Sequence, residues 1–330
     1  MTTIKFGILG TANIAKKAVI PAIKDAENAE VVAVASGSGK AKEFAKELEI
    51  PHSFESYEEL LEDESIDAVY IPLPNTLHKE WTIKAAKKGK HVLCEKPAAV
   101  TAEDAVEMVR ACEDNNVVFM EAFMYQFHPQ HQKARDIIAS GEIGEVKLMR
   151  STFSFDLSGR TGNIRLNKEL GGGSMYDVGC YCIHSSRMIL GSEPVKVYVT
   201  GDVPQDVGVD VSANAIMKMG NGVVASFDSS FELPMIDKYE VVGTKGSIQV
   251  PYAYRPDRPG VESVVKVTNA QGGTREEKVD GPQYTIMVEH FADCVLENKV
   301  PSYSGELTVK NLQAIEMCYQ SLEKGVPVKR

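Results

Sequence analysis

Ile4-Lys-Phe-Gly-Ile-Leu-Gly-Thr-Ala-Asn-Ile-Ala15 is the stretch that decides the fold. Its first six residues form an apolar run of strand length, Gly10 permits a tight turn, and a helix is predicted from there to about Asp25. A second apolar run, Val31–Ala35, predicts the next strand. A strand, a glycine turn, a helix and a strand in this order are the setting of a dinucleotide-binding fingerprint. Only Gly10 of the three fingerprint glycines is present, so the stretch equally fits an ordinary turn of an α/β protein.

The alternation of strands and helices continues to about residue 124. Further strands are predicted over 67–73, 91–94 and 117–123, and helices over 41–49, 56–63, 78–88 and 101–115. Repeated β-α pairs predict a doubly wound parallel sheet, in which ligands bind outside the carboxyl ends of the strands. Residues suited to such a site fall at predicted carboxyl ends: Gly10, Ser36, Pro74, Asn75, Lys96 and Glu121.

The pattern changes in the second half of the chain. A helix over 129–140 is followed by many strand-like segments, and Gly220-Asn-Gly222 is a hairpin signal between two of them. Because no helices separate the later strands, an open and mostly antiparallel sheet is predicted. Two helices, near 285–298 and 306–324, close the chain. The expected domains are therefore 1–124 and 125–330, with the last helix able to pack back on the first domain.

Composition limits the classes of partner. The 330 residues are 43% apolar and 25% charged, as in ordinary globular proteins. A net charge of -10 disfavours nucleic acid and anionic membrane surfaces as partners, and there is no apolar run of membrane-spanning length. The six cysteines are scattered, which predicts free thiols in a reducing cytoplasm and no metal site.

The end of the second strand bears on the cofactor. It reads Ser36-Gly37-Ser38-Gly39-Lys40 and lacks the Asp or Glu that binds the ribose 2′-hydroxyl of NAD. Two hydroxyls, backbone amides and a lysine are suited to a 2′-phosphate, so these residues favour NADP over NAD, although NAD remains open. The alternative is a solvated Gly-Ser loop.

Two further groups are suited to chemistry. Lys96, in Cys94-Glu95-Lys96-Pro97, is predicted at a strand end, where it points into the crevice above the sheet; the alternative is a surface lysine before a turn. Asp177, Tyr181 and His184 follow a glycine loop and share one face of a predicted helix. The alternative for these three is a partly exposed polar stripe.

Taken together, the residues resemble the Gfo/Idh/MocA oxidoreductase family, in the branch of glucose–fructose oxidoreductase, dimeric dihydrodiol dehydrogenase and NADP-dependent xylose dehydrogenase. The resemblance covers nearly the whole chain, and it lies in residues 7–15, Ile71-Pro-Leu-Pro-Asn-Thr-Leu-His78, Glu95-Lys-Pro97, Glu121-Ala-Phe-Met-Tyr125 with Phe127-His-Pro129, 163–166 and 171–181. Tyr181, four residues after Asp177, is typical of this branch.

The resemblance implies an N-terminal Rossmann domain, a C-terminal α/β domain, and a homodimer or homotetramer formed through the C-terminal sheet. It implies NADP as cofactor and a sugar, polyol or trans-dihydrodiol as substrate. Tyr181 would be the general acid/base, assisted by Lys96, with Asp177 orienting the substrate or Lys96. The peptide bond before Pro97 is commonly cis in the family.

The same resemblance assigns binding residues. Those for the cofactor are Gly10, Thr11, Ala12, Asn13, Ile14, Ser36, Gly37, Ser38, Lys40, Leu73, Pro74, Asn75, His78, Glu95, Lys96 and Glu121. Those for the substrate are Lys96, Phe155, Arg165, Asp177, Tyr181 and His184, with His290 as a further candidate. The chain departs from the branch at Gln126 and Gly37, where arginine is frequent. A non-catalytic dinucleotide-binding sensor of the same fold is the competing class; Lys96 and Tyr181 argue against it.

Overall fold

A computed structural model describes residues 3–159 and 162–330 and divides the chain into two compact units. The first unit contains the chain up to Met124 together with Gln283–Leu312, and the second contains Tyr125–Pro282 and Gln313–Arg330. The expected division assigned 125–330 to the second domain and allowed the last helix to pack back on the first. The structure groups helix α8 (Gln283–Leu296) and the first part of the last helix, α9 (Gly305–Lys324), with the first unit.

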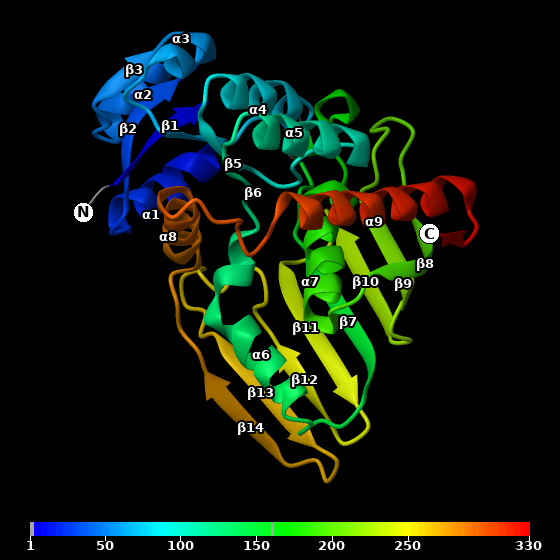
Figure 1. Cartoon of the computed structure of the whole chain (residues 1–330). Coiled ribbons are helices and arrows are strands. Elements are labelled where there is room, and N and C mark those ends of the chain that lie inside the picture. Colours follow the sequence, from blue (N-terminus) through cyan, green and yellow to red (C-terminus); the bar gives the residue numbers. More distant parts are fainter. Residues whose placement is uncertain (1–2, 160–161) are drawn as a thin grey trace. The chain divides into compact units, whose positions relative to one another are not determined.

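The first unit is built on a parallel sheet (Figure 1). Its strands are β1 (Ile4–Leu9), β2 (Ala29–Ala35), β3 (His52–Phe54), β4 (Ala68–Ile71), β5 (His91–Cys94) and β6 (Phe119–Glu121). They lie in the order β3-β2-β1-β4-β5-β6, and every pair is parallel. The order reverses between β1 and β4, which is where doubly wound sheets bind ligands. The predicted doubly wound sheet is confirmed.

Helices of the first unit begin where the sequence supplies caps. Ser56 Oγ accepts from the Glu59 N–H at 3.1 Å, and Thr101 Oγ1 accepts from the Asp104 N–H at 3.0 Å. The helical segments of the first unit include η1 (Ala15–Val19), α1 (Ile20–Asp25), α2 (Ala41–Glu47), α3 (Tyr57–Glu62), η2 (Asn75–Leu77), α4 (His78–Lys87), α5 (Ala102–Asp114), α8 and the first part of α9. Apolar side chains of β1, β2, β4 and β5 pack with α3, α4 and α5 into one buried core.

The second unit contains the larger sheet. Its strands are β7 (Val146–Ser154), β8 (Pro194–Asp202), β9 (Ser212–Met219), β10 (Val224–Ser230), β11 (Ile236–Gly243), β12 (Gly246–Val250), β13 (Val264–Asn269), β14 (Thr274–Lys278) and β15 (Val328–Lys329). Their order is β14-β13-β12-β11-β7-β10-β9-β8-β15, and the hairpin predicted at 220–222 joins β9 to β10. Among the described strands of this sheet, only β7 and β10 pair in parallel, so the predicted, mostly antiparallel sheet is confirmed.

One face of this sheet is covered and the other is open. Helices α6 (Pro129–Ala139) and α7 (Cys180–Leu190) lie on the same face, and η6 (Met175–Gly179) leads directly into α7 (Figure 1). On the other face Tyr198 of β8 and Ile216 of β9 are 42% and 58% exposed. The sheet is therefore a support for the helix that carries Asp177, Tyr181 and His184.

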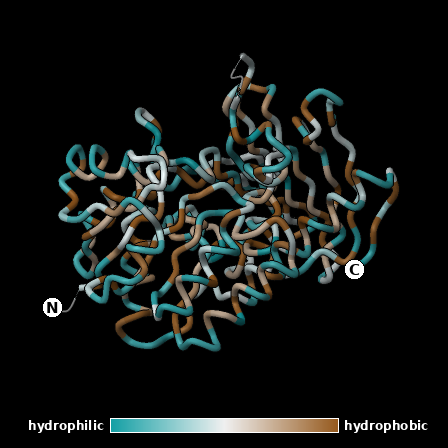
Figure 2. The backbone as a smooth tube through the Cα atoms, turned by 90° about the horizontal axis from the view of Figure 1, so that it is seen from above, coloured by the Kyte–Doolittle hydropathy of each residue, from teal (hydrophilic) through white to brown (hydrophobic). Residues whose placement is uncertain are grey.

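Hydrophobic segments alternate with hydrophilic ones along the described parts of the backbone (Figure 2). None of the helices in residues 3–159 and 162–330 is long and apolar enough to cross a membrane. All six cysteines are buried thiols outside any disulfide, which agrees with the prediction from their scattered spacing.

Candidate active site

In the first unit, the carboxyl ends of five adjacent strands gather the predicted cofactor residues. Gly10 follows β1, Ser36 follows β2, and Leu73 closely follows β4. Glu95 follows β5, and Glu121 is the last residue of β6. Because parallel strands that are neighbours in a sheet end at the same edge, these positions lie along one rim of the unit.

The turn after β1 is built for close approach. Gly10 has φ 116°, a backbone conformation that side chains rarely adopt, and its N–H donates to the Ala35 carbonyl at 2.8 Å. A Cβ at this position would lie 3.2 Å from Leu73 Cδ2. The helical stretch that follows starts at Asn13, with Thr11, Ala12 and Ile14 half-buried around it. A helix start behind a glycine turn presents N–H groups and a positive dipole end, and it fits a pyrophosphate.

The turn after β2 offers hydroxyls and no carboxylate. Ser36 Oγ and Ser38 Oγ lie 2.9 Å apart, and the Ser38 N–H approaches Ser36 Oγ at 3.4 Å. Gly37, Ser38 and Lys40 are exposed, and nothing lies within 4 Å of the position that a Cβ on Gly37 would take. These donors fit a phosphate group.

The loop that carries Lys96 is held by buried groups of neighbouring strands. Tyr70 of β4 donates its hydroxyl to Glu95 Oε1 at 2.5 Å, and the Lys96 N–H donates to Glu95 Oε2 at 3.2 Å. Burial, and next the Glu95 carboxylate, raise the pKa of Tyr70 well above its usual value, so Tyr70 remains a donor. The Ala98 N–H donates to Glu121 Oε1 at 2.8 Å, and the Lys96–Pro97 peptide bond is cis. The backbone of the loop from which the Lys96 side chain projects is therefore fixed.

His78 differs from its expected role of contacting the cofactor. Its ring is fully buried at 0% exposure, with Nδ1 3.0 Å from the Pro97 carbonyl oxygen and Nε2 2.8 Å from the Leu73 carbonyl oxygen. Burial lowers the pKa of His78 to about 4, so the ring is neutral and donates its single N–H to one of these carbonyls. His78 ties the loop after β4 to the loop after β5. Pro74 and Asn75, between them in sequence, are half-buried.

Two other candidates of the first unit have structural contacts. Glu121 is fully buried and supports the Ala98 N–H. His290 of α8 accepts the Ser302 N–H on Nε2 at 3.0 Å, which ties α8 to the segment before α9.

In the second unit, three of the predicted substrate residues lie together. Arg165 Nε donates to Asp177 Oδ2 at 2.6 Å, and the Arg165 guanidinium carbon is 5.7 Å from the centre of the Phe155 ring. The glycine loop packs on the Arg165 backbone, because a Cβ on Gly172 would lie 2.4 Å from the Arg165 carbonyl oxygen. The arrangement places an ion pair beside an aromatic face, which suits a polar, ring-shaped or polyhydroxylated ligand.

Tyr181 lies in an aromatic cluster of the second unit. Its ring centre is 5.3 Å from that of Phe153 and 5.5 Å from those of Tyr125 and Tyr254. His184 is buried with its ring centre 5.5 Å from that of Tyr125, and Tyr125 Oη lies 2.5 Å from His184 Nδ1. Burial lowers the pKa of His184 well below its usual value, so His184 is neutral. The ring of Tyr181 is thus held by packing.

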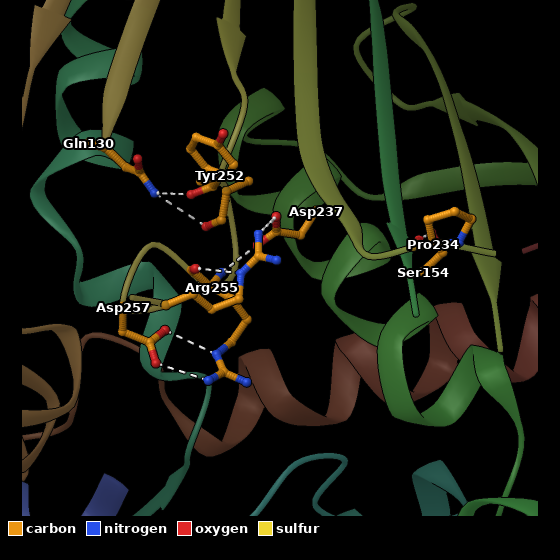
Figure 3. A network of polar contacts seen from close by, with 9 residues as sticks. Gln130, Ser154, Pro234, Asp237, Tyr252, Arg255 and Asp257 are labelled. Carbon is orange, nitrogen blue, oxygen red and sulfur yellow. Dashed lines mark hydrogen bonds and ion pairs between the residues drawn. The ribbon is translucent and has the colours of Figure 1, made fainter. Parts of the chain in front are cut away.

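The segment that carries Tyr254 is anchored at both ends (Figure 3). Gln130 Nε2 donates to the Tyr252 carbonyl at 2.9 Å, and the Arg255 N–H donates to Asp237 at 2.7 Å.

Sequence reasoning assigned no role to Tyr125 or Tyr254. Tyr125 lies within a family motif, which was the available signal, whereas nothing local marks Tyr254. Gln126, the departure from the branch, has a buried Nε2 without a hydrogen-bond partner among the described residues.

The comparisons with known proteins identify the family. The model for the oxidoreductase family with an NAD-binding Rossmann fold matches residues 4–123, and that for the GFO/IDH/MocA C-terminal domain matches residues 131–249. The chain belongs to the Gfo/Idh/MocA family of oxidoreductases. No group of His, Cys, Asp and Glu side chains that is suited to a metal ion occurs within residues 3–159 and 162–330.

Its relatives include proteins that are named as dehydrogenases of a sugar and of a diol. The chain is 40% identical to D-xylose 1-dehydrogenase (NADP(+)) 2 of Haloferax volcanii over 98% of this chain and 99% of that protein. It is 34% identical to trans-1,2-dihydrobenzene-1,2-diol dehydrogenase of Xenopus laevis over 89% of each chain. Among solved structures, a 3-ketoreductase from Actinomadura kijaniata in complex with NADP and TDP-benzene is similar, with a TM-score of 0.92, 29% identity and coverage of 97% and 98%.

Proposed function

We propose that this chain is an NADP-dependent dehydrogenase or reductase that interconverts a hydroxyl and a carbonyl group on a sugar, polyol or trans-dihydrodiol. The observation that carries the proposal is the loop at the carboxyl end of β5, where buried side chains fix the backbone of Lys96. The relatives named for xylose and dihydrodiol chemistry support the substrate class.

The residues present fit the cofactor. The Gly10 turn and the helix start at Asn13 would hold the pyrophosphate, and Ser36, Ser38 and Lys40 would hold the 2′-phosphate. When bound, the nicotinamide supplies or accepts the hydride.

The chain's own residues handle the proton. Tyr181 Oη gives a proton to the carbonyl oxygen in reduction and removes it from the hydroxyl in oxidation. A free tyrosine has a pKa of about 10, so it needs a positive charge to act near neutral pH. Lys96 provides that charge and also polarises the substrate oxygen. Asp177, fixed by Arg165, orients other hydroxyls of the substrate.

The cofactor preference gives a direct test. We expect NADPH to bind at least about 10-fold more tightly than NADH in a fluorescence titration, which corresponds to about 1.4 kcal/mol. Gly37→Asp should weaken NADPH binding by about 10-fold or more and change NADH binding little, because the new carboxylate repels the 2′-phosphate. Gly37→Asn has the same shape without the charge, and the open space at Gly37 accommodates both side chains. Equal effects of the two substitutions would contradict this assignment.

The substrate class is tested on the same protein with a panel of aldoses, polyols and diols, read at the nicotinamide absorbance. Turnover of any panel member supports the proposal. Tight NADPH binding without turnover across the panel would favour the dinucleotide-binding sensor instead.

The open face of the second unit's sheet supports a proposed homo-oligomer, a dimer or tetramer. A hollow of about 560 Å³ lies on this sheet, and the exposed Tyr198 and Ile216 are among the residues that line it. We expect Ile216→Lys to lower the molar mass measured by light scattering toward that of one chain. Val300→Lys changes a residue that is 78% exposed in the first unit, and it should leave the molar mass unchanged. An unaltered mass for Ile216→Lys would contradict assembly through this face.

A further inference from the structure

The carboxylate of Asp210 lies at the start of the helix that carries Tyr181. Asp210 is in the segment between β8 and β9 and is only 2% exposed. Burial raises its pKa to about 6, so the carboxylate is ionised at pH 7.5. A buried charge is costly unless it is hydrogen-bonded, and its partners therefore indicate what it does.

Three of the hydrogen bonds that Asp210 accepts come from one helix start. Oδ2 accepts from Ser174 Oγ at 2.8 Å and from the Met175 N–H at 2.7 Å, and the Asp210 carbonyl accepts from the Ser174 N–H at 2.8 Å. The first N–H groups of a helix have no partner within the helix, and a carboxylate there also favours the helix dipole. Asp210 therefore fixes both the position and the direction of the helix that begins at Met175.

The same carboxylate links this helix start to two other elements. Oδ1 accepts from the hydroxyl of Tyr319 on α9 at 2.8 Å, and Ser174 Oγ lies 3.0 Å from Ser229 Oγ on β10. The Tyr319 ring packs against Tyr176 at 4.6 Å between ring centres. Hydrogen bonds therefore connect the helix start both to β10 of the sheet and to the last helix.

Gly173 shows how closely the loop and the carboxylate approach. A Cβ at Gly173 would lie 2.3 Å from Asp210 Oδ1 and 2.8 Å from Tyr319 Oη, and its φ of 126° is one that side chains rarely adopt. A larger residue at 173 would displace the carboxylate from the helix start. This contact gives the last glycine of Gly171-Gly-Gly173 a role that the sequence did not reveal.

We propose that Asp210 is a positioning residue for the reaction: it holds the start of the helix Met175–Leu190 so that Tyr181 and Asp177 stand where the substrate needs them. The inference rests on the proposed function, because it assigns Asp210 to the step that Tyr181 performs. Displacement of a reacting group by about 1 Å lowers the rate by up to about 100-fold.

The opposite end of the same helix provides a matched control. Arg187 donates through Nε and Nη2 to Glu193 at 2.6 and 2.9 Å, and Arg187 is buried. Glu193→Gln and Asp210→Asn each change one carboxylate to an amide at one end of the helix. Both lower stability, but only Asp210→Asn releases the end near Asp177 and Tyr181.

The experiment compares kcat and the KM for NADPH and for the panel substrate at pH 7.5, with thermal unfolding measured alongside. We expect Asp210→Asn to lower kcat by about 10- to 100-fold with the KM for NADPH within about twofold, and Glu193→Gln to keep kcat within about twofold. A normal kcat for Asp210→Asn, or losses of kcat that follow the melting temperature equally in both variants, would overturn the inference. If Asp210→Asn does not fold, Tyr319→Phe and Ser174→Ala each remove one donor and should lower kcat by a smaller factor; an unchanged kcat in both also overturns it.

A measurement that does not require turnover distinguishes a failure of this inference from a failure of the proposed function. If the wild type turns over no panel substrate, the proposed function fails, and the ¹³Cζ resonance of Tyr181, assigned with Tyr181→Phe, is measured instead. A shift in Asp210→Asn that is absent in Glu193→Gln supports positioning by Asp210. Identical Tyr181 resonances in the two variants overturn it.

Discussion

Replacing Lys96 with methionine is expected to lower kcat by about 10³-fold or more while leaving the Kd for NADPH within a few-fold of the wild type. The proposed role of Lys96 is to favour the phenolate of Tyr181 and to polarise the substrate oxygen, and both effects require the ammonium charge. The loop itself should persist, because Tyr70, Glu121 and His78 hold its backbone through Glu95, Ala98 and Pro97. Stopped-flow turnover and NADPH fluorescence titration measure the two quantities.

Lys87→Met is the matched control for this substitution. Lys87 lies at the exposed end of α4 in the same unit, so the same loss of charge there should change kcat by less than about twofold. A Lys96→Met protein with normal turnover would refute the proposed mechanism. Loss of NADPH binding in Lys96→Met would instead show that Lys96 serves the cofactor.

Replacing Tyr181 with phenylalanine is expected to lower kcat by about 10²- to 10⁴-fold, the usual contribution of a positioned acid or base. The substitution removes only the hydroxyl, and the ring contacts with Tyr125, Phe153 and Tyr254 remain. Steady-state rates across pH test the role further, because the remaining activity should lose the limb of the pH profile that Tyr181 sets.

Two comparisons sharpen the Tyr181 prediction. Tyr198→Phe removes a hydroxyl from a tyrosine that is 42% exposed on the open sheet face, and it should keep kcat within about twofold. The double variant with Lys96→Met and Tyr181→Phe should be little slower than the slower single variant, since Lys96 acts largely through Tyr181. If the loss of kcat in the double variant equals the product of the losses in the two single variants, Lys96 and Tyr181 act independently.

The sheet of the first unit could be predicted because most of its strands are continuous apolar runs. Strands β1, β2, β4 and β5 are buried on both faces, and such runs are distinct in sequence. Strand β3 was missed because it has three residues, largely exposed at the sheet edge. The parallel pairing of β7 with β10 also has no local signal, since it joins segments about 75 residues apart and pairing depends on tertiary packing.

The assignment of α8 to the first unit shows the same limit. In the sequence α8 follows the strands of the second unit, but Glu289 and Asp293 of α8 accept hydrogen bonds from Asn28 in the first. These contacts span more than 260 positions, and no window of sequence contains them. Linear order alone therefore does not assign α8 to the first unit.

The candidate residues were predictable to the extent that they lie at strand ends in the first unit or on one helix face in the second. The positions of Gly10, Ser36 and Lys96 follow from the strand pattern, and that of Asp177 from helical spacing. The pattern cannot distinguish a residue that faces a ligand from one that supports it. His78 belongs to the motif but is buried among backbone carbonyls, and Asp210 lies in a segment without any motif.

Because its cysteines are buried, the folded protein is expected to react slowly with thiol reagents. Alkylation and oxidation attack the thiolate, and burial raises the pKa of Cys112, Cys182 and Cys318 to about 12. The other three thiols are buried as well. A cysteine introduced at an exposed position would thus be the one reactive thiol of the folded variant. The wild-type protein therefore already suits site-specific attachment of a fluorophore or spin label.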